Sequence, residues 1–149
     1  MRLNPWQDAI LARLRDQLNE AIPVKDGGYT EGTEEVVGKL PNGVLQPYVI
    51  VWFGGSVSAG PGNDGIAGVR QSSRTGLMHI ECIGADGTMP RQLGDEVRDA
   101  LIGYQPAGEG ELQEDGQPTI RNPISTTTGL DVRYSYALTF KGFVNATWT

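Results

Sequence analysis

The sequence contains two segments in which apolar residues recur at the spacing of an α-helix. The first opens at Asn4 and Pro5, an N-cap residue followed by proline at the first helical position. Apolar residues then follow at steps of three and four residues until Pro23 ends the pattern. The second segment runs from Thr88 to Gly103, and its apolar residues share one helical face. The sequence therefore predicts one amphipathic helix in each segment.

Other segments have the composition or the alternation of β-strands. Residues 48–53 (YVIVWF) are β-branched and aromatic, which predicts a strand covered on both faces, one cover being a possible second subunit. Residues 77–83 and 132–141 alternate between apolar and polar positions, which is typical of strands with one buried face. The final strand is expected to have a polar outer face. Short edge strands are expected within residues 34–40 and 118–120.

Composition narrows the range of functions. The chain has 149 residues, a length suited to a single domain over residues 1–149. Most of its 21 glycines fall in three connections, residues 24–47, 54–68 and 107–130. The net charge of -6 argues against a protein that binds nucleic acid by neutralising phosphates. The lone Cys82 forms no internal disulfide, and no apolar run is long enough to span a membrane.

The motifs that resemble catalytic or cofactor sites lack the context that such sites need. Residues 60–65 (GPGNDG) match a dinucleotide-binding pattern, but the residues after them have no sustained apolar helical face. His79 and Cys82 are three apart on a predicted strand, so they project to opposite faces. A single histidine also excludes a His-rich metal site. We expect no enzyme activity, no cofactor and no metal.

Taken together, the order of these segments resembles a known family. A short amphipathic helix is followed by a glycine-rich stretch and an apolar strand, then by an Arg/Ser/Gly loop, a strand, a second helix and the terminal strand. The segments that carry the likeness are 40–48 (LPNGVLQPY), 70–76 (RQSSRTG), 84–87 (GADG), 101–103 (LIG) and 133–140 (RYSYALTF). In this order and texture the chain resembles the tail terminator proteins of long-tailed bacteriophages, also called minor tail or head–tail joining proteins.

The resemblance implies an α+β fold and a structural role. The fold would be a mostly antiparallel or mixed sheet of about four strands, with two helices packed on one face and long glycine-rich loops. Six copies would form a ring that caps the tail tube, stops its polymerisation and provides the surface to which the head docks. The implied partners are other copies of the chain, the major tail tube protein and a head–tail connector or neck protein. DNA would pass through the lumen without specific binding, and the protein would be assembled in the host cytoplasm and reside at the head-proximal end of the virion tail.

A ring requires an interface between two different surfaces of the subunit, and the doubly apolar strand at 48–53 is the first candidate for one of them. The basic residues between and on the strands are candidates for contacts with neighbouring subunits or with the tube. We expect one of the acidic loops, 24–47 or 107–130, to face the channel. The candidate interface residues are Tyr48, Trp52, Arg70, Arg74, Arg133 and Lys141.

Two alternative functions remain open from the sequence. A head-closure or connector-adaptor protein of the phage neck is also small, acidic and ring-forming. From another class, a small cytosolic nucleotide-binding domain would use the glycines of residues 60–65.

Overall fold

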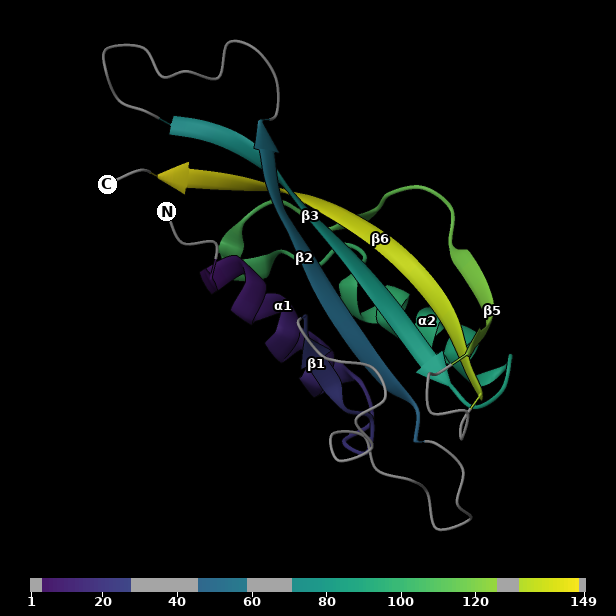
Figure 1. Ribbon diagram of the computed structural model, residues 1–149. Coiled ribbons are helices and arrows are strands. Elements are labelled where there is room, and N and C mark those ends of the chain that lie inside the picture. The colour runs from purple at the N-terminus through teal and green to yellow at the C-terminus, as the bar shows by residue number, and fades with distance from the viewer. Residues whose placement is uncertain (1–3, 28–45, 59–70, 126–131, 148–149) are drawn as a thin grey trace.

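A computed structural model describes residues 4–27, 46–58, 71–125 and 132–147 (Figure 1). The elements along the chain are α1 (Asn4–Gln17), β1 (Val24–Asp26), β2 (Tyr48–Ser58), β3 (Gln71–Gly84), α2 (Met89–Leu101), the 3-10 turn η2 (Pro106–Gly108), β4 (Gln113–Glu114), β5 (Thr119–Ser125) and β6 (Val132–Thr147). Helices and strands are mixed along the chain without regular alternation. The structure therefore confirms the predicted α+β class.

The strands form one mixed sheet in the order β1-β2-β3-β6-β4, and β5 also pairs with β6. The pairing of β1 with β2 is parallel, whereas the other pairs are antiparallel. The long strands β2, β3 and β6 make up the middle of the sheet, and the short strands lie at its edges. The sheet has six strands in place of about four because β1 and β4 are short segments that the sequence pattern does not predict.

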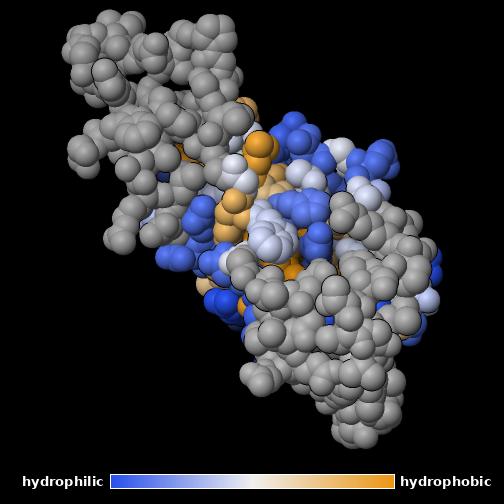
Figure 2. Space-filling model, viewed as in Figure 1, coloured by the Kyte–Doolittle hydropathy of each residue, from blue (hydrophilic) through white to orange (hydrophobic). Residues whose placement is uncertain are grey.

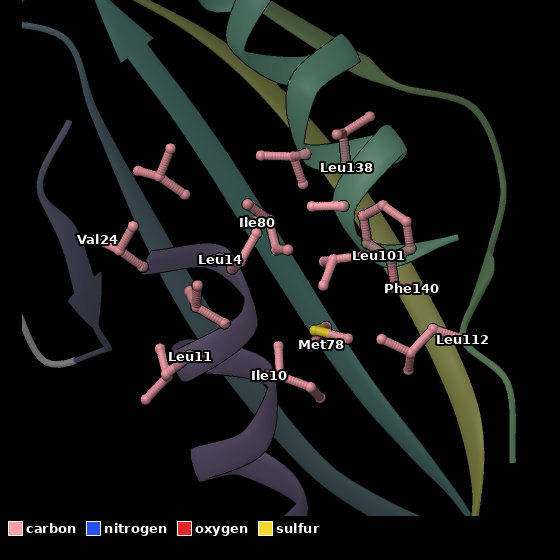
Figure 3. Packing of buried hydrophobic residues seen from close by; sticks show 14 of the residues in the cluster. Ile10, Leu11, Leu14, Val24, Met78, Ile80, Leu101, Leu112, Leu138 and Phe140 are labelled. Carbon is pink, nitrogen blue, oxygen red and sulfur yellow. The ribbon is translucent and has the colours of Figure 1, made fainter. Parts of the chain in front are cut away.

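Both helices pack on one face of the sheet, as predicted. Successive side chains of a strand point to opposite faces, so alternate residues of β2, β3 and β6 meet the apolar stripes of α1 and α2. Figure 3 shows this layer from the helix side. The residues that it labels are Ile10, Leu11, Leu14, Val24, Met78, Ile80, Leu101, Leu112, Leu138 and Phe140. All are buried, so this layer is the main hydrophobic core.

The first helix ends earlier than the sequence pattern predicts. It ends at Gln17, although Leu18 is buried and Ile22 is half-buried as the pattern requires. The cause is Asn19, whose side-chain oxygen accepts a hydrogen bond from the Ala21 amide at 2.9 Å. Such local bonds offer the backbone an alternative to the helix. The chain therefore turns at Asn19 and enters β1.

The second helix lies where it is predicted. Backbone amides at its N-terminus donate hydrogen bonds to a residue that precedes the helix. The Asp86 carboxylate accepts hydrogen bonds from the amides of Thr88 and Met89, at 2.9 and 2.8 Å. Gly103 follows the helix with φ of 81°, a conformation that glycine adopts without strain. Arg98 then ties the helix to the sheet through Glu114 at 3.1 Å and the Tyr136 hydroxyl at 3.0 Å.

Strands β2, β3 and β6 are longer than predicted. Residues 54–58 and 71–76 continue the strands, and Ser56 and Thr75 lie in the paired part of β2 and β3. In Figure 1 these ends of the three strands reach beyond the two helices. We call residues 54–58, 71–76 and 142–147 the arm. The predicted strand at 34–40 lies outside the described residues, whereas the one at 118–120 falls largely within β5.

A glycine pair at the base of the arm makes room for Trp6 of α1. Gly76 and Gly142 are directly paired across β3 and β6. A Cβ atom on Gly76 would lie 2.7 Å from Cη2 of Trp6, and one on Gly142 would lie 3.6 Å from Cζ2 of the same ring. Trp6 is buried here and meets Phe53 edge-on, with ring centroids 6.2 Å apart. The indole therefore occupies space that side chains at these two positions would fill.

This contact predicts that Gly76→Ala destabilises the fold. The added methyl group would overlap the Trp6 ring, so we expect the free energy of unfolding to fall by about 1–3 kcal/mol, as for other overpacked cores. Gly87→Ala is the matched control, because a Cβ atom there meets nothing within 4 Å. Urea denaturation of the two variants measures the difference. Equal midpoints for the two variants would contradict the proposed packing.

Cys82 provides a second test of the core. It lies on the helix face of β3, and burial raises the pKa of its thiol to about 12 although Arg98 acts in the opposite direction. A free thiol loses its proton near pH 8.5. The folded state therefore holds this proton more tightly than the unfolded state does. The stability that results is present below about pH 8.5 and is lost as the pH rises toward about 12.

We therefore expect Cys82 to resist alkylation at pH 8, at least about 100-fold more than in urea, because the thiolate is the reacting form. Unfolding midpoints should also fall between pH 8 and pH 10 by more than they do in Cys82→Ala. That variant controls for all other titrating groups. A thiol that reacts equally fast with and without urea would show that Cys82 is accessible in the folded chain.

Candidate assembly surface

The sheet face opposite the helices, which we call the outer face, is closed at one end. Tyr48 and Ile50 of β2 and Ile83 of β3 are fully buried there and form a small cluster of their own, with Ala85 packed against it. The strand at 48–53 is therefore apolar and covered on both faces at its start, as predicted. This cover exists within the chain itself.

Arg133 of β6 is buried at this closed end. Its side chain is only 2% exposed, and its Nη1 donates a hydrogen bond to the Tyr48 hydroxyl at 3.2 Å. The guanidinium also lies 6.0 Å from the centre of the Tyr48 ring. Ser135 and Ala137 beside it on β6 are buried as well. The predicted polar outer face of the last strand is thus buried at its first half, where Arg133 is bonded to Tyr48.

The other end of the outer face is open and apolar. Trp52 is 37% exposed and Phe143 is 61% exposed, and Leu77 is partly exposed beside them. Figure 2 shows apolar residues gathered in a strip between polar ones on the side of the sheet that faces the viewer. A groove of about 250 Å³ runs along this area, and its lining residues include Trp52, Leu77, His79 and Thr139. We call this area, defined by Trp52, Leu77, His79, Thr139 and Phe143, the outer patch.

Polar contacts border the outer patch. Lys141 Nζ lies 3.4 Å from Asp115 Oδ1, and both side chains are partly exposed. His79 Nδ1 lies 3.4 Å from Thr139 Oγ1, and its Nε2 lies 3.6 Å from Glu81 Oε1. The Asp115 amide donates to the Thr139 carbonyl at 2.7 Å, which fixes the carboxylate beside the groove. The patch thus combines apolar side chains with the polar pair His79 and Thr139, and the ion pair of Lys141 and Asp115 lies beside it, as in protein contact surfaces that have an apolar centre and a polar rim.

The structure offers little support for chemistry at this surface. Among the described residues no group of His, Cys, Asp and Glu is arranged to hold a metal ion. Cys82 lies in the core and His79 on the outer face, so the two do project from opposite faces of β3. No described helix has the length and apolar character needed to cross a membrane. The dinucleotide-like residues 60–65 lie outside the described part of the chain.

The predicted interface residues therefore fall into three groups. Trp52 and Lys141 lie on the outer face with exposed area. Tyr48 and Arg133 lie inside the chain, which corrects the expectation that they are surface residues. Arg74 belongs to β3 of the arm, but its side chain and the whole of Arg70 lie outside the described residues.

Phe143 is a surface residue that the sequence reading missed. Its signal was present, because the alternation that places Lys141 on the outer face continues to the next odd position. The acidic segment 107–130 stays one of the two predicted channel linings. Glu114 is bound to Arg98 and Asp115 to Lys141, so two of its acids are engaged within the chain.

Comparisons with known proteins bear on the fold. No protein-family model matches the sequence, and no curated protein matches it. Among solved structures, the chain is similar to a sheath/tube terminator of an extracellular contractile injection system, PVC, in its extended state. The TM-score is 0.54 at 16% sequence identity, and the alignment covers 99% of this chain and 58% of that one. The chain thus spans a little more than half the length of the terminator.

A second solved structure aligns with 91% of this chain and 94% of its own, at 16% identity and a TM-score of 0.45. At 16% identity the likeness to the injection-system terminator shows a shared fold. A terminator-like fold is therefore the class that the structure defines.

The positions of Arg133 and Lys141 predict effects of different size for the same substitution. Arg133→Ala removes a buried side chain and its bond to Tyr48, so we expect it to lower the free energy of unfolding by about 2–4 kcal/mol. Lys141→Ala removes one exposed ion pair and should change stability by less than about 1 kcal/mol. Urea denaturation measures both. Equal stabilities for the two variants would contradict the burial of Arg133.

Proposed function

We propose that this chain is a structural protein that caps the tube of a tail-type machine and stops its polymerisation. The observation that carries the proposal is the likeness to a sheath/tube terminator over 99% of the chain. The order of helices, strands and loops along the sequence supports the proposal independently, because it resembles the order in phage tail terminators. The described residues hold no metal cluster, and the open end of the outer face exposes Trp52 and Phe143, which suits contact with other proteins better than catalysis. We therefore propose a structural role without enzyme activity.

The outer patch supports assembly into a ring. Trp52 and Phe143 are among three large apolar residues with substantial exposure in the described part of the chain, and these two lie on the same face. Aromatic residues in apolar patches are the usual anchors of protein interfaces. In our proposal identical copies, six as in the phage family, close into a ring on the end of the tube. The tube protein is the partner beneath it.

The partners on the side of the ring away from the tube depend on the kind of particle to which the tube belongs. In a long-tailed phage the ring would sit at the head-proximal end of the virion tail, meet a connector or neck protein and let DNA pass. In a contractile system it would meet the sheath as well. A net charge of -6 suits a lumen through which DNA slides without being held. A neck head-closure protein is the alternative function, and the fold likeness to a terminator favours capping over head closure.

Electron microscopy of the protein mixed with its own tail tube tests the proposal. We expect rings at one end of each tube and tubes of constant length. In-frame deletion should give overlong or headless tails, whereas loss of a head-closure protein would leave normal tails beside leaky heads. Tubes without rings, together with normal tail lengths after deletion, would overturn the proposal.

A point variant tests the contribution of the outer patch. Phe143→Ser should weaken ring formation on tubes at least about tenfold, because it removes an exposed aromatic anchor. Its effect on folding should stay within about 0.5 kcal/mol, as for other surface substitutions. The matched control is Ile102→Ser, since Ile102 is 52% exposed but follows α2, away from the outer patch. Equal ring formation by both variants would show that the patch is not used.

A further inference from the structure

The outer edge of β2 is paired over only part of its length. The parallel strand β1 covers Val49, Ile50 and Val51 and then ends. Beyond that point β2 continues to Ser58, and among the described residues no strand lies on this side of it. Its inner side is paired with β3 as far as Ser58. The edge of β2 in the arm therefore presents backbone N–H and C=O groups to a possible partner strand.

The outer edge of β6 in the arm is likewise paired over only part of its length. β4 pairs with β6 at Phe140 and Lys141 only. Further along, Gly110 and Glu111 lie beside Phe143 and Gly142, and the one backbone hydrogen bond described there runs from the Gly110 amide to the Phe143 carbonyl at 3.0 Å. β6 then continues to Thr147, paired with β3 on its inner side. Among the strands that the structure describes, none covers the outer side of β2 or of β6 in the arm, which is thus a three-stranded ribbon.

These edges lack the residues with which proteins usually protect a sheet edge. Charged residues, lysine above all, and proline prevent an open edge from pairing with another chain. Residues 52–58 (WFGGSVS) and 142–147 (GFVNAT) contain no charge and no proline. The short strands at the covered parts of the two edges do carry charge, at Lys25, Asp26 and Glu114. Charge is therefore missing from the edges where strand pairing is still open.

The directions of the strands determine how the two edges can meet. β2 and β6 are both antiparallel to β3, so they run in the same direction. Copies related by rotation about an axis along the strands keep this direction, so β2 of one copy would pair with β6 of the next in parallel. The edge of β2 already accepts a parallel strand, β1. The pairing is also between two different edges, which is the type of contact that closes a ring.

We propose that the arm joins neighbouring copies of this chain by strand addition, with the β2 edge of one copy paired to the β6 edge of the next. The sheet of each subunit would then continue into its neighbour, and backbone hydrogen bonds would supply much of the contact. The outer patch overlaps the arm at Phe143 and continues along the same strands, so it would be brought beside the neighbouring sheet. This inference rests on the proposed ring and names the surface that builds it.

The test uses two variants that each block one edge. Ser56→Lys with Ser58→Lys protects β2, and Asn145→Lys with Thr147→Lys protects β6. The matched control is Gln113→Lys with Gln117→Lys, two exposed positions outside the arm. Light scattering after gel filtration over a concentration series gives the molar mass. We expect the wild-type and control proteins to form a closed oligomer and each edge variant to remain at the monomer mass of 16.0 kDa.

An equimolar mixture of the two edge variants is the decisive sample. Each variant retains one intact edge, and the two intact edges are complementary, so the mixture should give a dimer and nothing larger. Thermal unfolding within a few degrees of wild type shows that the variants are folded. Oligomers in either single variant, a mixture that stays monomeric, or a wild type that is monomeric at all concentrations would overturn strand addition.

Cysteine cross-linking keeps the inference testable if a lysine variant fails to fold. Ser58→Cys is combined with cysteines placed in turn at positions 143–147, and the buried Cys82 serves as the internal control. Strand addition predicts disulfide-linked ladders for alternate positions, because side chains of one strand alternate between faces. Absence of ladders at all these positions would contradict it. If rings form on tubes but none of these cross-links form within them, strand addition is rejected and the proposed capping function stands.

Discussion

The contact between Trp6 and the glycine pair Gly76 and Gly142 determines how the helices lie on the sheet. The indole occupies the place of the side chain that Gly76 lacks, with 2.7 Å between its Cη2 and a Cβ atom built on Gly76, and it lies in ordinary contact with Gly142. Leu112 is packed against Gly142 in the same way, at 2.9 Å. A close approach of this kind is possible only where both paired strand residues lack a side chain. The start of α1 is therefore fixed at the base of the arm, and the rest of the core follows from that position.

The position of the helices divides the sheet into regions with different roles. Both helices lie on one face of the sheet. The opposite face therefore has to be covered by other parts of the chain or remain exposed for contact with other proteins. At one end it is closed, and Arg133 is held against Tyr48 there. At the other end Trp52 and Phe143 remain exposed, and the ends of the three strands of the arm reach beyond both helices in Figure 1. The same chain thus contains a rigid half, stabilised by its own core, and a half whose apolar residues and backbone edges suit other subunits.

The sequence predicts the regular parts of this fold because their signals are local. The spacing of Leu93, Val97 and Leu101 and the alternation around Ile80 are sufficient for α2 and β3, and both are confirmed. The extension of β3 through Gly76 is not predictable in this way, because the role of that glycine depends on Trp6, distant in sequence. The burial of Arg133 likewise depends on Tyr48, which is 85 residues away. The outer patch is predictable in part. The exposure of Phe143 continues the alternation that already places Lys141 on the outer face, whereas the groove beside it depends on several strands.

The distribution of charge relates the fold to assembly. A net charge of -6 opposes non-specific contact between copies in solution. Acids near the sheet edges are partly neutralised within the chain, Glu114 by Arg98 and Asp115 by Lys141. Arg74 is the one charged residue in the sequence of the arm. In the proposed ring, repulsion would act over the whole subunit and backbone pairing only at the arm, so the balance would favour copies whose arms are aligned. The end of a tube would add to this alignment and determine where the ring forms.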